Sequence, residues 1–226
     1  MRCYYCESPP TSQEHAPPRC LFPTLAESGG VDLRKNLITV PSCEEHNSLK
    51  AGDDEHLMYV LSMNVTSGSE GQRLFESKVI RAIQRRAALA HRVLKETAPV
   101  VLRDERTGEE FQTIAVRADW PRLEETFKRI ASALFAHHFG SVYRGPIRVI
   151  MEFQRSIKGA SAANSNAVML EISAMADRLF KASPLRGENQ PIFAYQVVGD
   201  ASSDRVAMRS HFYGGSKVFV AFGDDA

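Results

Sequence analysis

The chain has 226 residues and a net charge of +1, and 43% of its residues are hydrophobic and 24% charged. This composition is typical of a soluble globular protein, and the length suits one large domain or a small module joined to a larger body. No apolar run is long enough to cross a bilayer, and the N-terminus lacks the apolar core of a signal peptide. We therefore expect a cytoplasmic protein without a membrane partner.

Charge is distributed unevenly along the chain. Residues 1–58 carry five basic and nine acidic side chains, whereas the remainder carries 23 basic and 18 acidic ones. An acidic front on a basic body suits a cation site beside a surface that binds a polyanion. Chance produces the same asymmetry in many chains, so the net charge alone excludes no class of partner.

The N-terminal segment contains two pairs of metal-seeking residues. Cys3 and Cys6 are separated by two residues, and so are Cys43 and His46. Three thiolates and one imidazole fill the tetrahedral shell of a structural zinc ion. Residues 1–58 lack a periodic apolar pattern, so the metal would replace the core that this segment does not have. The spacing therefore predicts a structural zinc site.

Cys20 is the competing fourth ligand. All four cysteines lie in the first fifth of the chain, which in a reducing cytosol favours metal binding over disulfides. Cys20, however, has no partner at metal-ligand spacing and is flanked by apolar residues in PPRCLFP. We expect it to pack as a small hydrophobic residue.

A polar stretch and a long helix are predicted next. Residues 64–72 contain glycine and polar residues, which predicts a loop. Residues 73–96 carry apolar side chains at spacings of three and four, which predicts a helix. The helix also carries a basic row at spacings of 3, 4, 7 and 3, formed by Lys78, Arg81, Arg85, Arg92 and Lys95. Such a row neutralises backbone phosphates irrespective of base sequence, although a solvated helix face shows the same pattern.

The rest of the chain alternates between strand and helix patterns. Residues 100–116 predict a β-hairpin with its turn near Thr107 and Gly108. A second helix is predicted over residues 121–139, with Asp119 as its N-cap and Gly140 ending it. Then follow a predicted strand at 146–153, a helix at 166–181, and an antiparallel meander of three strands at 192–198, 205–213 and 217–223.

Two further motifs lie between the metal-ligand pairs. QEHAPP (13–18) places an acid before a histidine and two prolines, and SGGVDLRKNLITVPSCEEHN (28–47) contains Gly-Gly, Asn-Leu and the second pair followed by asparagine. In this order, over about the first 55 residues, the chain resembles the HNH endonuclease family in its H-N-N variant. His46 stands where that family usually has a fourth cysteine, and Glu14 where aspartate is common.

The resemblance implies a treble-clef zinc scaffold that carries a ββα-metal nuclease site. His15 would be the general base, because the pKa of an imidazole lies near the operating pH. Asn36 would brace the loop and orient that imidazole. Glu14 and Asn47 would supply oxygen ligands to a catalytic Mg²⁺ or Mn²⁺ that binds the scissile phosphate. Asp53, Asp54 and Glu55, which follow, are predicted to form a solvated helix face.

The predicted fold class is α+β. Residues 1–60 form the zinc-stabilised module, and residues 73–226 form an α+β body with two long helices and the meander. The sequence leaves the role of this body open, and docking of nucleic acid or a partner is the candidate. The predicted function is metal-dependent endonuclease cleavage of nucleic acid, with DNA favoured, in bacterial defence or a mobile element. The alternative is a non-catalytic zinc-stabilised module that binds nucleic acid or protein. A regulatory protein partner and a homo-oligomer both remain open.

Overall fold

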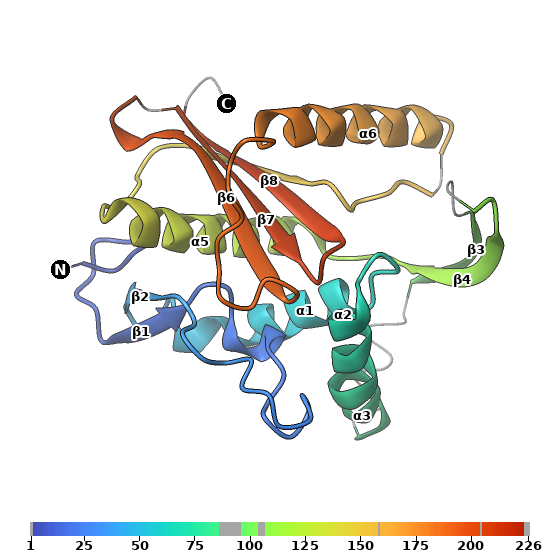
Figure 1. Ribbon diagram of the computed structural model, residues 1–226, viewed down its shortest axis with the longest axis horizontal. Coiled ribbons are helices and arrows are strands. Elements are labelled where there is room, and N and C mark those ends of the chain that lie inside the picture. Colours follow the sequence, from blue (N-terminus) through green and yellow to red (C-terminus); the bar gives the residue numbers. More distant parts are fainter. Residues whose placement is uncertain (1, 86–95, 104–106, 158, 204, 224–226) are drawn as a thin grey trace.

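The computed structural model describes residues 2–85, 96–103, 107–157, 159–203 and 205–223. Within these residues the chain combines helices with antiparallel sheets (Figure 1). This confirms the coarse prediction of helices mixed with antiparallel strands. None of the helices in this part of the chain is long and apolar enough to cross a membrane.

The N-terminal segment follows the order strand, strand, helix. Strand β1 (Ser12–His15) pairs antiparallel with β2 (Thr39–Ser42), and helix α1 (Ala51–Ser62) follows. The loop between the strands includes Gly29 and Gly30, whose φ angles of 70° and 96° favour glycine. This segment packs on the body of the protein, because one continuous cluster of buried apolar residues runs from Cys3 and Leu57 to Phe127 and Phe222.

The helix predicted from residue 73 begins earlier than expected. Helix α2 (Ser69–Leu74) leads through a π-helical turn (Phe75–Val79) into α3 (Ile80–Arg85). The loop predicted over 64–72 is therefore wrong in its last residues. The physical reason is packing: a Cβ on Gly71 would meet the ring of Tyr213 at 3.0 Å, so this glycine allows close approach to the body rather than a flexible turn.

The predicted hairpin and the second predicted helix are both present. Strands β3 (Thr97–Arg103) and β4 (Glu110–Val116) pair antiparallel, and Figure 1 shows this hairpin at one end of the molecule, apart from the other strands. Helix α5 (Trp120–Phe139) begins where the Asp119 side chain accepts a hydrogen bond from the Arg122 backbone N–H at 3.2 Å. It ends at Gly140, which has the left-handed conformation that ends many helices.

The predicted meander is part of a four-stranded antiparallel sheet. Strand β5 (Ile147–Met151) joins it at one edge, so the order is β5-β8-β7-β6. The other members are β6 (Phe193–Asp200), β7 (Arg205–Phe212) and β8 (Ser216–Phe222). Helix α6 (Ala162–Leu179) connects β5 to the meander and lies close to the predicted range of 166–181.

The two faces of this sheet differ in chemistry. Alternate residues of β8, such as Val218 and Val220, are buried on the side of α5, where Phe127 packs on Phe212 with ring centroids 5.7 Å apart. On the opposite side, Arg209 of β7 is buried and binds acidic groups, one of them on α6. Helices α5 and α6 therefore cover opposite faces of the sheet, one mainly apolar and one with buried charge (Figure 1).

Candidate metal centre and the adjoining histidine

The four predicted zinc ligands converge on one point. The ligand atoms of Cys3, Cys6, Cys43 and His46 all lie within 4.8 Å of one another. The Cys6 and Cys43 sulfurs are 3.7 Å apart, and the His46 Nδ1 lies 3.2 Å from the Cys43 sulfur and 3.9 Å from that of Cys3. A tetrahedral zinc with standard bond lengths holds its ligand atoms roughly 3.6–3.8 Å apart. The donor set and its spacing fit a structural zinc ion.

Backbone hydrogen bonds shape the two turns that carry the candidate ligands, one at residues 3–6 and one at residues 43–46. The Cys3 N–H donates to the Ser8 carbonyl at 3.0 Å, and the Tyr4 N–H donates to Pro41 of β2 at 2.9 Å. In the second turn, the Ser48 N–H donates to the Glu44 carbonyl at 2.9 Å. The first turn is thereby fixed to the strand that leads directly into the second, so the β1–β2 pair brings together ligands that are 40 residues apart in the chain.

Cys20 lies outside this cluster, as predicted. Its Sγ donates to the backbone carbonyl of Asp54 at 3.4 Å, and burial raises its pKa to about 12. A thiol held in this protonated form is a poor metal ligand, because metals bind the thiolate. Cys20 therefore contributes packing between the loop and α1.

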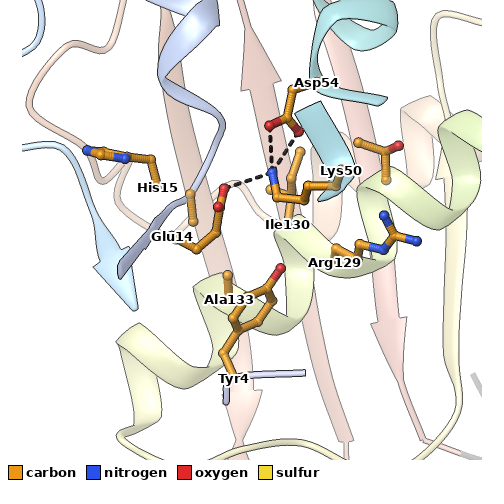
Figure 2. Close-up of a pocket in the computed structure, with 10 residues that line it drawn as sticks. Tyr4, Glu14, His15, Lys50, Asp54, Arg129, Ile130 and Ala133 are labelled. Atoms are coloured by element: carbon orange, nitrogen blue, oxygen red, sulfur yellow. Dashed lines mark hydrogen bonds and ion pairs between the residues drawn. The ribbon is translucent and has the colours of Figure 1, made fainter. Parts of the chain in front are cut away.

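Beside the zinc cluster, a buried lysine lies between two carboxylates. The Lys50 Nζ is 2.8 Å from Glu14 Oε1 and 2.6 Å from Asp54 Oδ1, and Glu14 and Lys50 are only 5% and 6% exposed. Figure 2 shows both carboxylates directed at this ammonium group. The cavity that they line with His15 and Arg129 has a volume of about 10 Å³, close to the space of one water molecule. Glu14 thus already has a cationic partner.

Lys50 is the shared partner of a buried carboxylate, Glu14, and a partly buried one, Asp54, which affects their protonation. Burial raises the pKa of Glu14 to about 7, although the positive charge of Lys50 acts in the opposite direction. Burial likewise raises the pKa of Asp54 above its ordinary value. The excess buried negative charge is relieved when one of the two carboxylates binds a proton.

We expect this site to make stability depend on pH. The folded protein keeps a proton on Glu14 between its ordinary pKa of 4.5 and about 7, whereas the unfolded chain releases it. The contribution of Glu14 therefore destabilises the fold progressively as pH rises through this window, by at most about 1.4 kcal/mol per pH unit. Urea unfolding at several pH values should show this slope, and Glu14→Gln should remove it. A wild-type slope that Glu14→Gln leaves unchanged would contradict the assignment.

His15, the predicted general base, points to the side of β1 opposite to that of Glu14. Consecutive strand residues point to opposite faces, and Figure 2 shows the His15 ring directed away from Glu14 and Lys50. The imidazole is partly exposed. Burial, followed by the positive charges of Arg19, Lys50 and Arg34, lowers the pKa of His15 below its usual value. At neutral pH the ring is therefore an unprotonated acceptor in a positively charged neighbourhood.

The two predicted asparagines occupy turns near β1 and β2. Asn47 follows His46, the last candidate zinc ligand, and its Nδ2 donates to the Ser12 hydroxyl at 2.7 Å and to the Gln13 carbonyl at 3.2 Å. Asn36 lies just before β2 with a φ of 53°, a left-handed conformation that asparagine tolerates better than most residues. Glu14 faces Lys50 while Asn47 binds the start of β1. The predicted Mg²⁺ or Mn²⁺ site of Glu14 with Asn47 stays a prediction that this geometry does not support.

Sequence reasoning missed the residues that surround Glu14. The sequence patterns assign no role to Lys50, and they predict that Asp53 and Asp54 lie on a solvated helix face. Instead, Asp54 binds Lys50, and Asp53 accepts from Arg122 at 2.7 Å and from Arg129 at 3.0 Å. The spacing of four between Lys50 and Asp54 was a visible signal of a helical ion pair. The partners on α5 had no such local signal.

The predicted basic row is only partly described. Arg92 and Lys95 lie outside the described residues. Lys78 is turned toward the N-terminal segment, where its Nζ lies 3.5 Å from Glu27 and donates to the Cys20 carbonyl at 3.3 Å. Arg81 and Arg85 are exposed. The phosphate-binding role of the row stays a prediction, with Lys78 engaged inside the protein.

Comparisons with known proteins add no further assignment. No protein-family model matches the chain, and neither a curated protein nor a solved structure does so. The geometry of the site must therefore support any functional conclusion by itself.

Proposed function

We propose that the N-terminal segment is a zinc-stabilised treble clef of the HNH type and that the protein hydrolyses phosphodiester bonds in nucleic acid, DNA being the favoured substrate. The observation that carries the proposal is the strand–strand–helix order around the zinc cluster, with His15 on the first strand. Its imidazole is partly exposed and its pKa is lowered. A neutral histidine on a rigid strand suits a general base.

The chemistry assigned to these residues is an in-line hydrolysis. The imidazole of His15 takes a proton from water as the water oxygen attacks phosphorus. The bond from phosphorus to the leaving 3′ oxygen breaks, and that oxygen leaves with the bond's electron pair and then takes a proton from solvent. Positive charge from Arg19 and Arg34 near His15 favours a bound phosphate and the additional negative charge of the transition state.

A divalent cation plays a smaller role in this proposal than the sequence alone predicts. When bound, such an ion would bind the phosphate and stabilise the leaving oxygen. Glu14 is buried against Lys50, so we assign no step to a Glu14-bound ion. The reaction is instead to be measured with Mg²⁺, with Mn²⁺ and with a chelator that is too weak to remove the structural zinc.

A variant of the base tests the proposal. His15→Ala is expected to lower the rate of plasmid cleavage about 10²–10⁴-fold, the usual contribution of a general base. Lys35→Ala, an exposed change in the loop between β1 and β2, is the matched control and should cleave at the wild-type rate. The wild-type rate should rise with pH as His15 loses its proton. Because the pKa of His15 is lowered, this rise should occur at a pH below the usual imidazole pKa. Equal cleavage by wild type and His15→Ala would disprove the assignment of the base.

A second candidate is a zinc-stabilised module that binds nucleic acid or protein without cleaving it. The observation that favours it is the Glu14–Lys50 ion pair. Glu14, the predicted metal ligand, binds a lysine of the protein in place of a metal ion. Under this alternative, nucleic-acid binding survives His15→Ala and no cleavage appears with any cation. The same assay, run with a gel-shift measurement on each variant, separates the two functions.

A further inference from the structure

A large cavity lies outside the zinc cluster and the Glu14–Lys50–Asp54 site. It has a volume of about 820 Å³, is open to solvent on one side and is bordered by α1, the β3–β4 hairpin, the start of α5 and the residues that follow β5. Small-molecule sites typically have volumes of about 300–1,000 Å³. None of the predicted zinc ligands or nuclease residues lines it, so its function is separate from that of the N-terminal site.

Aromatic side chains line the cavity, and some of its apolar side chains remain exposed to solvent. Four aromatic side chains line it: Tyr59, Phe111, Trp120 and Phe153. Phe111 is 45% exposed, and it shares one face of the hairpin with Leu102, its partner on β3, which also lines the cavity. Apolar side chains turned toward a cavity rather than a packed core favour a ligand with an apolar face, and aromatic rings stack on planar groups. The ligand is therefore expected to contain a planar ring.

Basic side chains outnumber acidic ones on the walls of the cavity. Five basic residues line the cavity: Arg103, Arg117, Arg122, Arg155 and Lys217. Three acidic residues line it: Glu55, Asp119 and Glu152. Each acid already accepts a hydrogen bond within the protein: Glu55 from the Tyr59 hydroxyl at 2.6 Å, Glu152 from Arg209 at 2.8 Å, and Asp119 from the start of α5.

The basic side chains retain donors for a ligand. Arg122 uses its Nε to bind Asp53, and Arg117 uses one terminal nitrogen to bind Glu96. A guanidinium has five N–H donors, so each of these arginines has further N–H groups that can point at an anion. The cavity therefore favours an anionic group over a neutral or cationic one.

A buried nitrogen on the wall also lacks a hydrogen-bond partner. Among the described residues, the Nε2 of His56 is the one buried side-chain nitrogen or oxygen for which the structure provides none. His56 lies on α1 and lines the cavity. Buried polar atoms are nearly always hydrogen-bonded, so an orphaned one at a cavity wall indicates a missing partner.

We propose that this cavity binds a small aromatic anion of the nucleotide class, with its ring among Tyr59, Trp120 and Phe153 and its phosphate near the arginines. The nucleotide base supplies the polar edge that His56 Nε2 lacks. The proposal does not depend on nuclease activity. Because α1 carries both His56 and Asp54, a bound nucleotide also stabilises the helix that holds Lys50, and it should raise the thermal midpoint.

The protein carries its own reporter for this site. Trp120 is the single tryptophan of the chain and lines the cavity. Titration with AMP, GMP, CMP and UMP should change its fluorescence saturably for at least one of them, and the matching nucleoside, which lacks phosphate, should bind about tenfold more weakly or worse. His56→Ala and Arg155→Gln should each weaken nucleotide binding at least about fivefold. Arg178→Gln, an exposed change on α6 outside the cavity, should have no effect.

Four results would overturn the proposal. The first is the absence of saturable binding by any of the four nucleotides, in fluorescence and in calorimetry. The second is equal affinity for nucleotide and nucleoside, and the third is unchanged affinity in His56→Ala and Arg155→Gln. If His56→Ala does not fold, Phe111→Ala takes its place, since Phe111 is largely outside the core. A single-stranded oligonucleotide that binds where mononucleotides do not would also overturn it, in favour of strand binding.

Discussion

Cys43→Ser is expected to unfold the N-terminal segment and abolish zinc binding. Structural zinc contributes apparent binding energies of about 10–16 kcal/mol in small zinc modules, which equals or exceeds the total stability of about 5–15 kcal/mol that is typical of a domain. The buried side chains of residues 1–50 join the apolar cluster of the body and form no separate core, so the turns that carry the ligands depend on the metal. Loss of one thiolate leaves three ligands and removes most of this energy.

Metal analysis and thermal unfolding measure this effect. Wild-type protein should contain about one zinc per chain, and Cys43→Ser should contain none and lose near-ultraviolet circular dichroism from the tyrosines beside the site. The Tyr5 ring lies 4.9 Å from that of His46 and so reports directly on the cluster.

Cys20→Ser is the matched control for this variant. It is the same chemical change at a thiol that lies outside the cluster, so zinc content should stay at the wild-type level. A Cys43→Ser protein that remains folded without zinc would contradict the scaffold role. Loss of zinc in both variants would instead indicate that Cys20 is a ligand.

Arg209→Met is expected to destabilise the body by about 3–5 kcal/mol. Arg209 and Glu152 are 2% and 3% exposed, and the Arg209 Nε donates to Glu152 Oε1 at 2.8 Å. Arg209 also binds Asp177 at 2.5 Å, which joins β7 to α6. Removing the guanidinium leaves a buried carboxylate without its cationic partner, and the cost of that isolated charge exceeds the energy of an ordinary hydrogen bond.

Denaturant unfolding with two companion variants isolates the cause. Arg209→Met combined with Glu152→Met removes both charges and should recover most of the lost stability. Lys217→Met is the control, because Lys217 binds the same Asp177 at 3.1 Å but is 32% exposed, and surface pairs contribute about 0–1 kcal/mol. An Arg209→Met protein as stable as Lys217→Met would show that the buried pair is not needed.

Local sequence patterns determined the candidate zinc ligands and the regular elements of the body. Cys3 with Cys6 and Cys43 with His46 were identifiable because a two-residue separation lets both side chains of a pair reach one ion. Helix α5 was predictable since its cap at Asp119 and its end at Gly140 are set by groups within a turn of the helix end. The strands of the meander follow from alternation with a period of two.

Only the tertiary structure decided what the charged residues do. Glu14 is directed at Lys50, Asp53 binds Arg122 and Arg129 of α5, and Arg209 binds Glu152. In the sequence each of these residues looks like a metal ligand, a solvated charge or a surface cation, because the partners of most of them are between 36 and 76 residues away. The energy of a charge depends on its burial and its neighbours across space. Hydrophobic periodicity is a local property of the chain, whereas charge pairing is a property of the packed fold.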